Sequence, residues 1–415
     1  MKRAEEKILE RIDTLQDELV RLAKVLISVP TPDPPGENYD RCVKLIADYL
    51  KTIGANVDIL TWSPPSLSAH GQMRKAVERP NVFAEIKGDK GRPVLHFNGH
   101  YDVVPAAGSW SFDPYKPMIK GSNLYGRGSV DMKGAIAAML VAAKAVLSEK
   151  FPFHGTWSFS FVPDEEMDGE GGTKFLVEEK KLHADYCIVG EPSGRTSLFN
   201  GHLGCLWLEV KTFGKAAHAS APWAGINAFE KMVQFVNAVE GQIKPGLEEK
   251  RKKGSPCGSI ALGGKVETGD APNTIPASCT MTIDRRLAPG EDVKQSFSDL
   301  FAIIKKLEEE DPDFRAETKI LSSYDPCLTS AESRLVKTVT EAVRNASGES
   351  PEVRLMMAGC DMRYFRQAEM DTIVYGPGEI SAAHQTDEHV AIEDLVLAAK
   401  VYALSAMKLL GNITG

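Results

Sequence analysis

The sequence predicts an α/β protein in which a three-layer domain with a mainly parallel sheet is interrupted by an inserted α+β domain of ferredoxin-like plan. Three observations predict this fold. Up to residue 201, short apolar and β-branched runs alternate with helical runs, as parallel strands joined by crossover helices do. Residues 202–325 follow the order strand, helix, strand, strand, helix, strand, the plan of a small α+β domain. The alternation resumes in residues 326–415, so both ends of the chain are expected to build the larger domain.

The larger domain is expected to begin with two helices. Apolar residues recur at spacings of three and four from Ile8 to Leu26, which indicates one amphipathic helix, and a proline-rich segment ends it. A second helix is expected from Tyr39 to about Ile53. The strands and helices that follow are expected at Val82–Ile86, Val94–Asn98, Met132–Ser148 (helix), Thr156–Val162, Thr173–Lys180 (helix) and Tyr186–Val189.

The remaining helices and strands are assigned in the same way, from helical spacing of apolar residues and from short β-rich runs. The inserted domain is expected to contain strands Leu206–Val210, Ser259–Val266, Ser278–Arg286 and Ala316–Leu321, with helices Asn227–Glu240 and Val293–Glu310. The larger domain is expected to be completed by helix Ser333–Ala346, strands Val353–Met357 and Thr372–Tyr375, and helix Ile392–Leu410.

Composition indicates an ordinary soluble protein and excludes several classes of function. The 415 residues are 43% hydrophobic and 26% charged, and 49 basic against 57 acidic residues give a net charge of −8. An acidic chain without a basic tract is not expected to bind nucleic acid. The most apolar helical stretch, Gly134–Leu147, is too short to span a bilayer and contains Lys144, so no membrane association is expected.

Cysteine usage and the start of the chain indicate the compartment. The seven cysteines are widely spaced, with no Cys-x-x-Cys pair, which is typical of free thiols in a reducing environment. The first residues, Met-Lys-Arg-Ala-Glu-Glu, are charged and lack the apolar core of a signal peptide. A cytoplasmic location is therefore expected.

Histidine and carboxylate side chains stand just after the expected strands. His100 and Asp102 follow an apolar strand that ends at Gly99. Open α/β sheets place their ligands at the carboxyl ends of their strands. In a His-x-Asp pair, the carboxylate can accept the second ring N–H and so fix the tautomer of a metal-bound histidine. Taken alone, the pair fits an ordinary turn equally well.

Three further loops carry acidic groups. Asp131 lies in a glycine-rich turn before a helix; such a turn can cradle phosphate, but its spacing matches neither a dinucleotide fingerprint nor a P-loop. Glu165 and Glu166 follow a strand, in a run that also fits a solvated acidic loop. Glu191 follows the next strand.

Together these residues predict a metal centre. His384, in the segment after the last expected strand, adds a second histidine. Four carboxylates in one cleft would repel one another and raise one another's pKa values, and divalent cations would remove that cost. Histidine with carboxylate ligands suits zinc at a catalytic site that keeps an open coordination position.

The motifs at these positions resemble those of a known family. They are Gly-His-Tyr-Asp-Val-Val-Pro (99–105), Tyr-Gly-Arg-Gly-Ser-Val-Asp-Met-Lys-Gly (125–134), Asp-Glu-Glu (164–166), Gly-Glu-Pro (190–192), Gly-Pro-Gly (376–378) and Ala-His-Gln-Thr-Asp-Glu (383–388). In this order they are similar to the cocatalytic zinc deacylases and exopeptidases typified by acetylornithine deacetylase and succinyl-diaminopimelate desuccinylase. That family also includes glutamate carboxypeptidase and aminoacylase.

The resemblance implies a dinuclear centre in residues 1–201 and 326–415, the catalytic metal-binding domain. Asp131 would bridge two zinc ions per subunit, with cobalt or manganese as alternatives. His100 and Glu191 would complete one metal site, and Glu166 and His384 the other. The peptide bond between Asp131 and the following methionine is expected to be cis.

The resemblance also implies roles around the metals. Glu165 would be the general acid and base, and Asp102 would orient His100. The inserted domain would be a lid and dimerisation domain, so a homodimer is expected. Its His218 would help to hold the reacting carbonyl oxygen of the neighbouring subunit. Two residues match positions that contact the carboxylate end of the substrate: Asn273 and Arg286.

The expected activity is hydrolysis of the amide bond of an N-acyl amino acid or a related small amide. The alternatives are a dipeptidase or carboxypeptidase with the same metal core, and a catalytically silent relative that binds a small molecule. His202 stands where the desuccinylase branch has an arginine, and Gly359-Cys360-Asp361 stands where that branch has Gly-Thr-Ser-Asp. The His-x-Gly at 202–204 is more similar to the deacetylase branch, which disfavours succinyl-diaminopimelate as the substrate.

Other histidines are expected to be structural. His96 lies within a strand and is expected to be a hydrogen-bonded core residue. The remaining ones are expected on the surface or in loops: His70, His154, His183 and His389.

Overall fold

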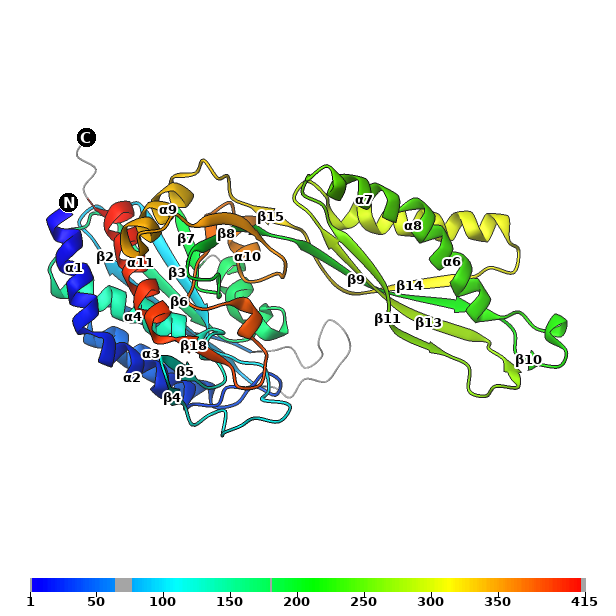
Figure 1. Cartoon of the computed structure of the whole chain (residues 1–415), viewed down its shortest axis with the longest axis horizontal. Helices are drawn as coiled ribbons and strands as arrows, with labels where there is room; N and C mark the ends of the chain where they lie inside the picture. Colours follow the sequence, from blue (N-terminus) through cyan, green and yellow to red (C-terminus); the bar gives the residue numbers. More distant parts are fainter. Residues whose placement is uncertain (1, 64–76, 180, 412–415) are drawn as a thin grey trace. The chain divides into compact units, whose positions relative to one another are not determined.

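A computed structural model of the protein describes residues 2–63, 77–179 and 181–411 (Figure 1). His70 lies outside the described residues. The chain divides into two compact units. The first comprises Met1–Gly201, Thr329–Leu355 and Cys360–Gly415; the second comprises His202–Leu328 and Met356–Gly359. The sequence predicts the return to the larger domain at residue 326, whereas the first unit resumes at residue 329.

The sheet of the first unit has the strand order β1-β2-β6-β3-β7-β17-β8, and β16 also pairs with β8. The neighbours β6, β3, β7 and β17 run parallel, whereas β1, β2 and β8 are attached in antiparallel fashion. The expected parallel sheet is therefore confirmed for its central strands. The bounds are β1 Asn56–Trp62, β2 Arg79–Lys87, β3 Val94–His100, β6 Thr156–Val162, β7 Tyr186–Val189, β8 Ser197–His202, β16 Glu352–Met356 and β17 Asp371–Val374.

Helices cover both faces of this sheet. Successive side chains of a strand point to opposite faces. On β3, the ring of His96 lies 5.6 Å from that of Phe365 in α10, whereas Phe97 lies 5.2 Å from Tyr402 in α11. Helices α10 and α11 therefore lie on opposite faces, which gives the expected three layers. The helices of this unit are α1 Lys2–Thr14, α2 Gln16–Ile27, α3 Tyr39–Thr52, α4 Lys133–Ser148, α5 Phe175–Glu178, α9 Arg334–Ser347, α10 Met362–Gln367 and α11 Ile392–Leu410.

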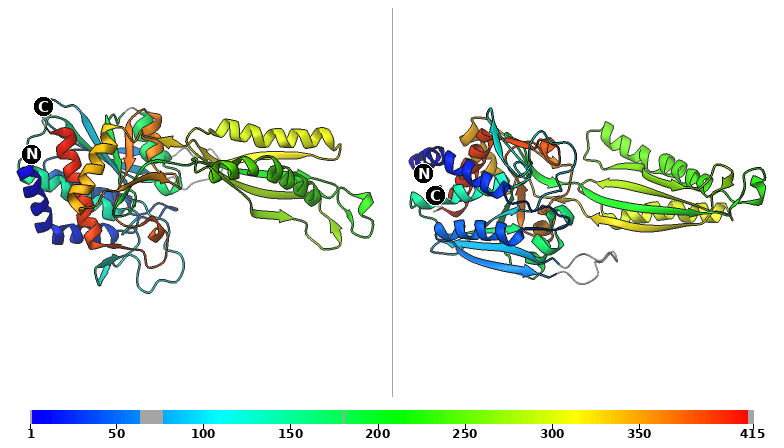
Figure 2. Two further views of the ribbon diagram at one scale, coloured as in Figure 1. Left: turned by 45° about the horizontal axis from the view of Figure 1, so that its top comes forward. Right: turned by 90° about the horizontal axis from the view of Figure 1, so that it is seen from below.

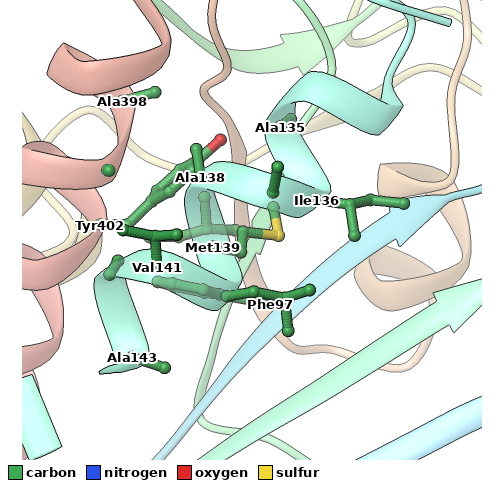
Figure 3. Packing of buried hydrophobic residues seen from close by; sticks show 14 of the residues in the cluster. Phe97, Ala135, Ile136, Ala138, Met139, Val141, Ala143, Ala398 and Tyr402 are labelled. Carbon is green, nitrogen blue, oxygen red and sulfur yellow. The ribbon is translucent and has the colours of Figure 1, made fainter. Parts of the chain in front are cut away.

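The layer that contains α4 and α11 holds the main core. Helix α4 is rich in alanine, and small side chains allow helices to pack closely. Figure 3 shows its alanines and Met139 in one buried cluster with Tyr402 of α11 and Phe97 of β3. Trp157 packs edge-on against Phe97, with ring centroids 5.3 Å apart. This core supports β3, which ends at His100, and the N-terminus of α4, which Asp131 precedes by two residues.

Two helix predictions need correction. The single opening helix is wrong, because the structure has α1 and α2 with a break at Leu15. The apolar stripe continues across that break, so periodicity could not detect it. The helix expected at Thr173–Lys180 is reduced to α5, because residues Glu170–Lys174 form a π-type turn that contains the non-helical Gly172. Two further strands were not predicted because they lack a long apolar run: β1, at the edge of the sheet, and β8, which pairs with β17 and β16.

The second unit has the predicted ferredoxin-like plan (Figure 2). Its four antiparallel strands are ordered β11-β13-β9-β14. Leu206, Leu208 and Val210 of β9 are buried in one core with residues of α6 and α8, while Trp207 between them is 44% exposed. The elements are β9 Gly204–Phe213, β10 Ala217–His218, α6 Ala228–Gln242, α7 Lys244–Lys252, β11 Ser259–Thr268, β12 Thr274–Ile275, β13 Ser278–Leu287, α8 Val293–Glu310, β14 Ala316–Tyr324 and β15 Cys327–Leu328. Helix α7 was not predicted.

The first unit also contains a separate three-stranded sheet. Its order is β18-β5-β4, with bounds His389–Ala391, Asn123–Tyr125 and Met118–Lys120. Among the described residues, no helix is both long enough and apolar enough to cross a membrane.

The buried histidine of β3 is a structural residue, as expected. His96 is fully buried, and its ring nitrogens lie 2.9 Å from Ser158 Oγ and 2.7 Å from Ser160 Oγ. Burial lowers the pKa of His96 to about 3. The folded protein therefore keeps this ring neutral at pH values where an exposed histidine is protonated.

His96 is expected to make folding less stable in mild acid. In the unfolded chain its pKa is about 6.5, so only the unfolded state takes up this proton, and stability falls by about 2 kcal/mol between pH 7 and pH 5. In His96→Gln this loss should be smaller by that amount, measured as the free energy of urea unfolding at both pH values. His183→Gln, a change at an exposed histidine, is the control. Equal pH dependence in wild type and His96→Gln would contradict the prediction.

Candidate metal centre

The candidate site residues follow neighbouring strands of the parallel part of the sheet. β3 ends at His100, β6 leads into the turn that carries Glu165 and Glu166, and β7 leads to Glu191. Because β6, β3 and β7 are adjacent and parallel, their carboxyl ends meet at one edge of the sheet. Asp131 lies directly before α4.

One half of the cluster is centred on His100. Its Nε2 lies 3.0 Å from Asp131 Oδ1 and 3.4 Å from Glu191 Oε1. The other half is centred on His384, whose Nε2 lies 3.1 Å from Asp131 Oδ2 and 3.1 Å from Glu166 Oε2. The two oxygens of Asp131 thus face two different histidines, each of which also faces a glutamate of its own.

Glu165 lies within the same cluster. Ligand atoms of Glu165, His100 and Glu191 are all within 4.8 Å of one another, as are those of His100, Asp131 and Glu166. Glu165 therefore lies beside the half that contains His100, whereas Glu166 contributes to the half that contains His384.

The charges of the cluster are unbalanced when protons alone are available. Burial and Asp131 raise the pKa of Glu191 to about 7, and burial with Glu191 raises the pKa of Glu165. Hydrogen bonds to Asp131 and Glu166 raise the pKa of His384 to about 11. Raised pKa values on the carboxylates mean that they tend to bind protons, and the raised pKa of His384 means that it tends to retain its proton. Both shifts indicate an excess of negative charge in the cluster. Divalent cations would neutralise it, and these nitrogen and oxygen donors fit zinc-type ions.

Asp102 lies next to His100, as the sequence predicts, and it contacts both His100 and the backbone of Glu166. His100 Nδ1 lies 3.0 Å from the backbone oxygen of Asp102 and 3.4 Å from its Oδ1. Asp102 Oδ2 accepts a hydrogen bond from the backbone N–H of Glu166 at 3.1 Å. If Nδ1 donates to Asp102, Nε2 is left facing the cluster.

Glu388 holds the turn that presents Asp131, a role that the sequence analysis did not assign. Its buried carboxylate accepts hydrogen bonds from the backbone N–H groups of Gly128 (3.0 Å), Val130 (2.9 Å) and Asp131 (3.1 Å). Arg127 Nη1 also donates to it at 2.7 Å. The quoted motif that ends in Glu388 was the available signal. The expected cis peptide bond between Asp131 and Met132 is confirmed.

Glu388→Ala is expected to destabilise the protein by about 3–5 kcal/mol, because it leaves the buried guanidinium of Arg127 and three backbone N–H groups without their acceptor. The free energy of urea unfolding of metal-free protein measures this loss. Asp387→Ala is the control: this neighbouring carboxylate is only partly buried and binds the exposed Ser111, so a much smaller loss is expected. Equal losses in both variants would contradict the role of Glu388.

The other residues predicted to act in catalysis or binding lie in the second unit. His218 and Asn273 are brought together, because β10 pairs with β12 and Ala219 N donates to Asn273 O at 2.9 Å. Both side chains are exposed. Arg286, on β13, donates to Asp284 through Nε and Nη2 at 2.9 and 3.1 Å.

A parallel-sheet edge that collects two histidines and four carboxylates, with one carboxylate shared, is the arrangement expected of a dinuclear metal site in a metal-dependent hydrolase. The particular family follows from comparison with known proteins. A model described as peptidase family M20/M25/M40 matches residues 96–408, so the chain belongs to that family. The resemblance inferred from the motifs is confirmed, and the protein is a metal-dependent amidohydrolase.

Similar proteins act on several amides. The chain is 30% identical over 380 residues to acetylornithine deacetylase of Myxococcus xanthus, covering 89% of this chain and 96% of that protein. It is 26% identical to N-formyl-4-amino-5-aminomethyl-2-methylpyrimidine deformylase of Bacillus subtilis, with 94% of each chain covered. A dinuclear metal-binding peptidase of the M20 family from Bacillus subtilis has the same fold, with a TM-score of 0.68, 17% identity and coverage of 97% and 100%.

Proposed function

We propose that the protein is a deacylase that hydrolyses the amide bond of an N-acyl amino acid with two bound metal ions. The shared carboxylate of Asp131, 3.0 Å from His100 and 3.1 Å from His384, is the observation that carries the proposal. One ion would be held by His100, Asp131 and Glu191, and the other by Asp131, Glu166 and His384. The donor set favours zinc, with cobalt or manganese as alternatives. When bound, the ions would polarise the scissile carbonyl and lower the pKa of water.

In this proposal Glu165 moves the proton. Its carboxylate lies beside His100 and Glu191, and burial with the charge of Glu191 raises its pKa, which favours proton uptake. Glu165 would accept the proton of the attacking water at Oε and pass it to the nitrogen of the leaving amine. Asp102 would keep His100 oriented through its backbone oxygen.

The proposed substrate is recognised by the second unit. The acetyl and formyl groups in the names of two relatives support a small acyl group. Asn273 and Arg286 would contact the carboxylate of the amino acid. Arg286 uses Nε and Nη2 for Asp284, so its Nη1, 3.5 Å from Tyr324 Oη, is the nitrogen proposed to face that carboxylate.

We propose a cytoplasmic homodimer formed through the second unit, in which His218 serves the site of the neighbouring subunit. Exposed apolar side chains on this unit support an interface; among them are Trp207, Trp223, Phe229, Val233, Val266 and Ile320. The seven cysteines, all free thiols, support a reducing compartment.

Metal analysis followed by a substrate panel tests the proposal. Purified protein should contain two metal ions per chain and hydrolyse N-acetyl or N-formyl amino acids faster than dipeptides. Faster turnover of dipeptides would replace the deacylase by a dipeptidase. Two bound metals without turnover of any member of the panel would indicate a binding protein, and fewer than two metals would overturn the dinuclear centre.

A further inference from the structure

The two glutamates of the candidate site sit in a turn with unusual backbone geometry. Glu165 and Glu166 occupy the single 3-10 turn Glu165–Met167. The residues at its two ends, Asp164 and Asp168, have φ angles of 73° and 78°. Aspartate adopts this left-handed conformation less readily than glycine, so contacts from elsewhere in the fold must hold it.

The first end of the turn is held by side-chain contacts of Asp164. This residue is fully buried. Its Oδ2 accepts a hydrogen bond from Gly171 N at 2.8 Å, and its Oδ1 accepts one from Nε of Arg79 in β2 at 3.2 Å. The beginning of the turn is therefore attached to the sheet.

The second end is held through a backbone oxygen. The side chain of Asp168 is 64% exposed, but its carbonyl accepts hydrogen bonds from Arg363 Nη2 at 2.8 Å and from the hydroxyl of Tyr364. Arg363 Nη2 also lies 3.0 Å from Tyr364 Oη, and its Cζ lies 4.7 Å from the centre of that ring. The guanidinium is buried, with only 9% of its side chain exposed. Two adjacent residues of α10 thus converge on one carbonyl.

Helix α10 also packs tightly against the next residue of this loop. A Cβ atom built on Gly169 would lie 2.9 Å from Asp361 Oδ1 and 3.0 Å from Tyr364 Cε2. Asp361 is itself held by Thr173 Oγ1, which donates to its Oδ2 at 2.6 Å. The segment 361–364 therefore forms one wall against the end of the turn.

The charge of Arg363 also acts on the turn. Burial disfavours the charged guanidinium, but Tyr364, Glu165 and Asp361 together raise the pKa of Arg363. The cation therefore lies in the electrostatic field of Glu165.

We propose that Arg363 is a positioning residue: by binding the carbonyl of Asp168, with help from Tyr364, it fixes the turn that aims Glu165. The proposal rests on the proposed function, because it assumes that Glu165 moves the proton. A carboxylate displaced by about 1 Å can lose on the order of 100-fold in rate, so a weaker hold on this turn should lower kcat. The substrate does not need to contact Arg363.

Three variants at this contact are compared. Arg363→Gln removes the charge and shortens the side chain. Arg363→Lys keeps the charge on a single donor nitrogen, and Tyr364→Phe removes the hydroxyl that also donates to the carbonyl of Asp168. Arg366→Gln is the matched control, since it lies on the same helix and donates to a backbone oxygen, that of Met370 at 2.7 Å, away from the turn. The assay uses the N-acetyl amino acid that wild-type protein hydrolyses fastest, together with metal analysis and hydrogen–deuterium exchange of the metal-loaded protein.

Arg363→Gln should lower kcat on the order of 30- to 100-fold, with KM changed by less than about threefold. Both metals should stay bound, and the amides of residues 165–169 should exchange faster. Arg363→Lys should recover about tenfold of that loss, because it keeps a charged donor. Tyr364→Phe should lose less than about tenfold, and the double variant should lose less than the product of the two, because both residues bind one carbonyl. Arg366→Gln should match wild type in kcat and in exchange at the turn.

Three results would overturn the inference. They are unchanged exchange at the turn in Arg363→Gln, unchanged kcat in the same variant, and a rise in KM alone, which would assign Arg363 to substrate binding. If Arg363→Gln does not fold, Arg363→Lys decides by the same readouts. Glu165→Gln separates this inference from the proposed function: if that variant keeps its turnover, the role of Glu165 fails, while the exchange data still report whether Arg363 holds the turn.

Discussion

Replacing Glu165 by glutamine should abolish most of the turnover and leave both metal ions in place. Glutamine has almost the same size and shape, but it cannot take up a proton from water and return it to the leaving amine. General acid–base catalysis contributes about 10²–10⁴-fold, so kcat should fall by about three to four orders of magnitude. The five proposed ligands are unchanged in this variant. Steady-state kinetics with an N-acetyl amino acid and metal analysis of the same preparation measure the two effects.

A change in the same loop provides the control for Glu165. Glu170→Gln makes the same substitution five residues further along, outside the groups that face His100. Its kcat should stay close to that of wild type. A Glu165→Gln variant that keeps both metals and at least a tenth of the wild-type kcat would contradict the proposed proton transfer. If Glu165→Gln loses a metal ion, Glu165 would instead be a metal ligand. Its position beside His100 and Glu191 also fits that role.

His218→Ala should fold, dimerise and bind both metals, yet lose about two to three orders of magnitude in kcat. The ring is exposed, and Ser220 N donates to its Nδ1 at 3.2 Å. When Nδ1 accepts this hydrogen bond, and the Ser220 hydroxyl 2.7 Å away donates to it as well, the neutral ring carries its proton on Nε2. His218 can therefore donate through Nε2 to the oxygen on which charge develops as the amide is attacked, and the loss of one such donor costs about 3–4 kcal/mol.

Mixing two inactive variants tests whether His218 acts on the neighbouring subunit. Glu165→Gln subunits keep a working His218, and His218→Ala subunits keep a working Glu165. In each heterodimer one site would combine both, so random mixing of equal amounts should restore about a quarter of the wild-type sites. Heterodimers that form without regaining activity would show that His218 does not act across an interface. His183→Ala, at an exposed histidine of the other unit, should leave kcat unchanged.

The sequence analysis identified the candidate metal ligands because each of them follows an apolar strand or lies in a compact motif. His100, Glu166 and Glu191 could be placed at one edge of the sheet once the strands were judged parallel. A local pattern is misleading near the start of the chain. The apolar stripe that runs through Leu15 hides the break between α1 and α2.

The sequence alone determined the α/β class, the inserted domain and the residue types of the candidate metal centre, because periodicity and short motifs are local properties of the chain. Only the tertiary structure decided which groups face one another. Asp131 shares its two oxygens between His100 and His384, Glu388 binds the N–H groups of the turn before α4, and Arg363 binds the carbonyl of Asp168. These last three contacts join segments from 195 to more than 250 residues apart. No local pattern encodes such distances; they follow from how the packed core brings β3, α4 and α10 together.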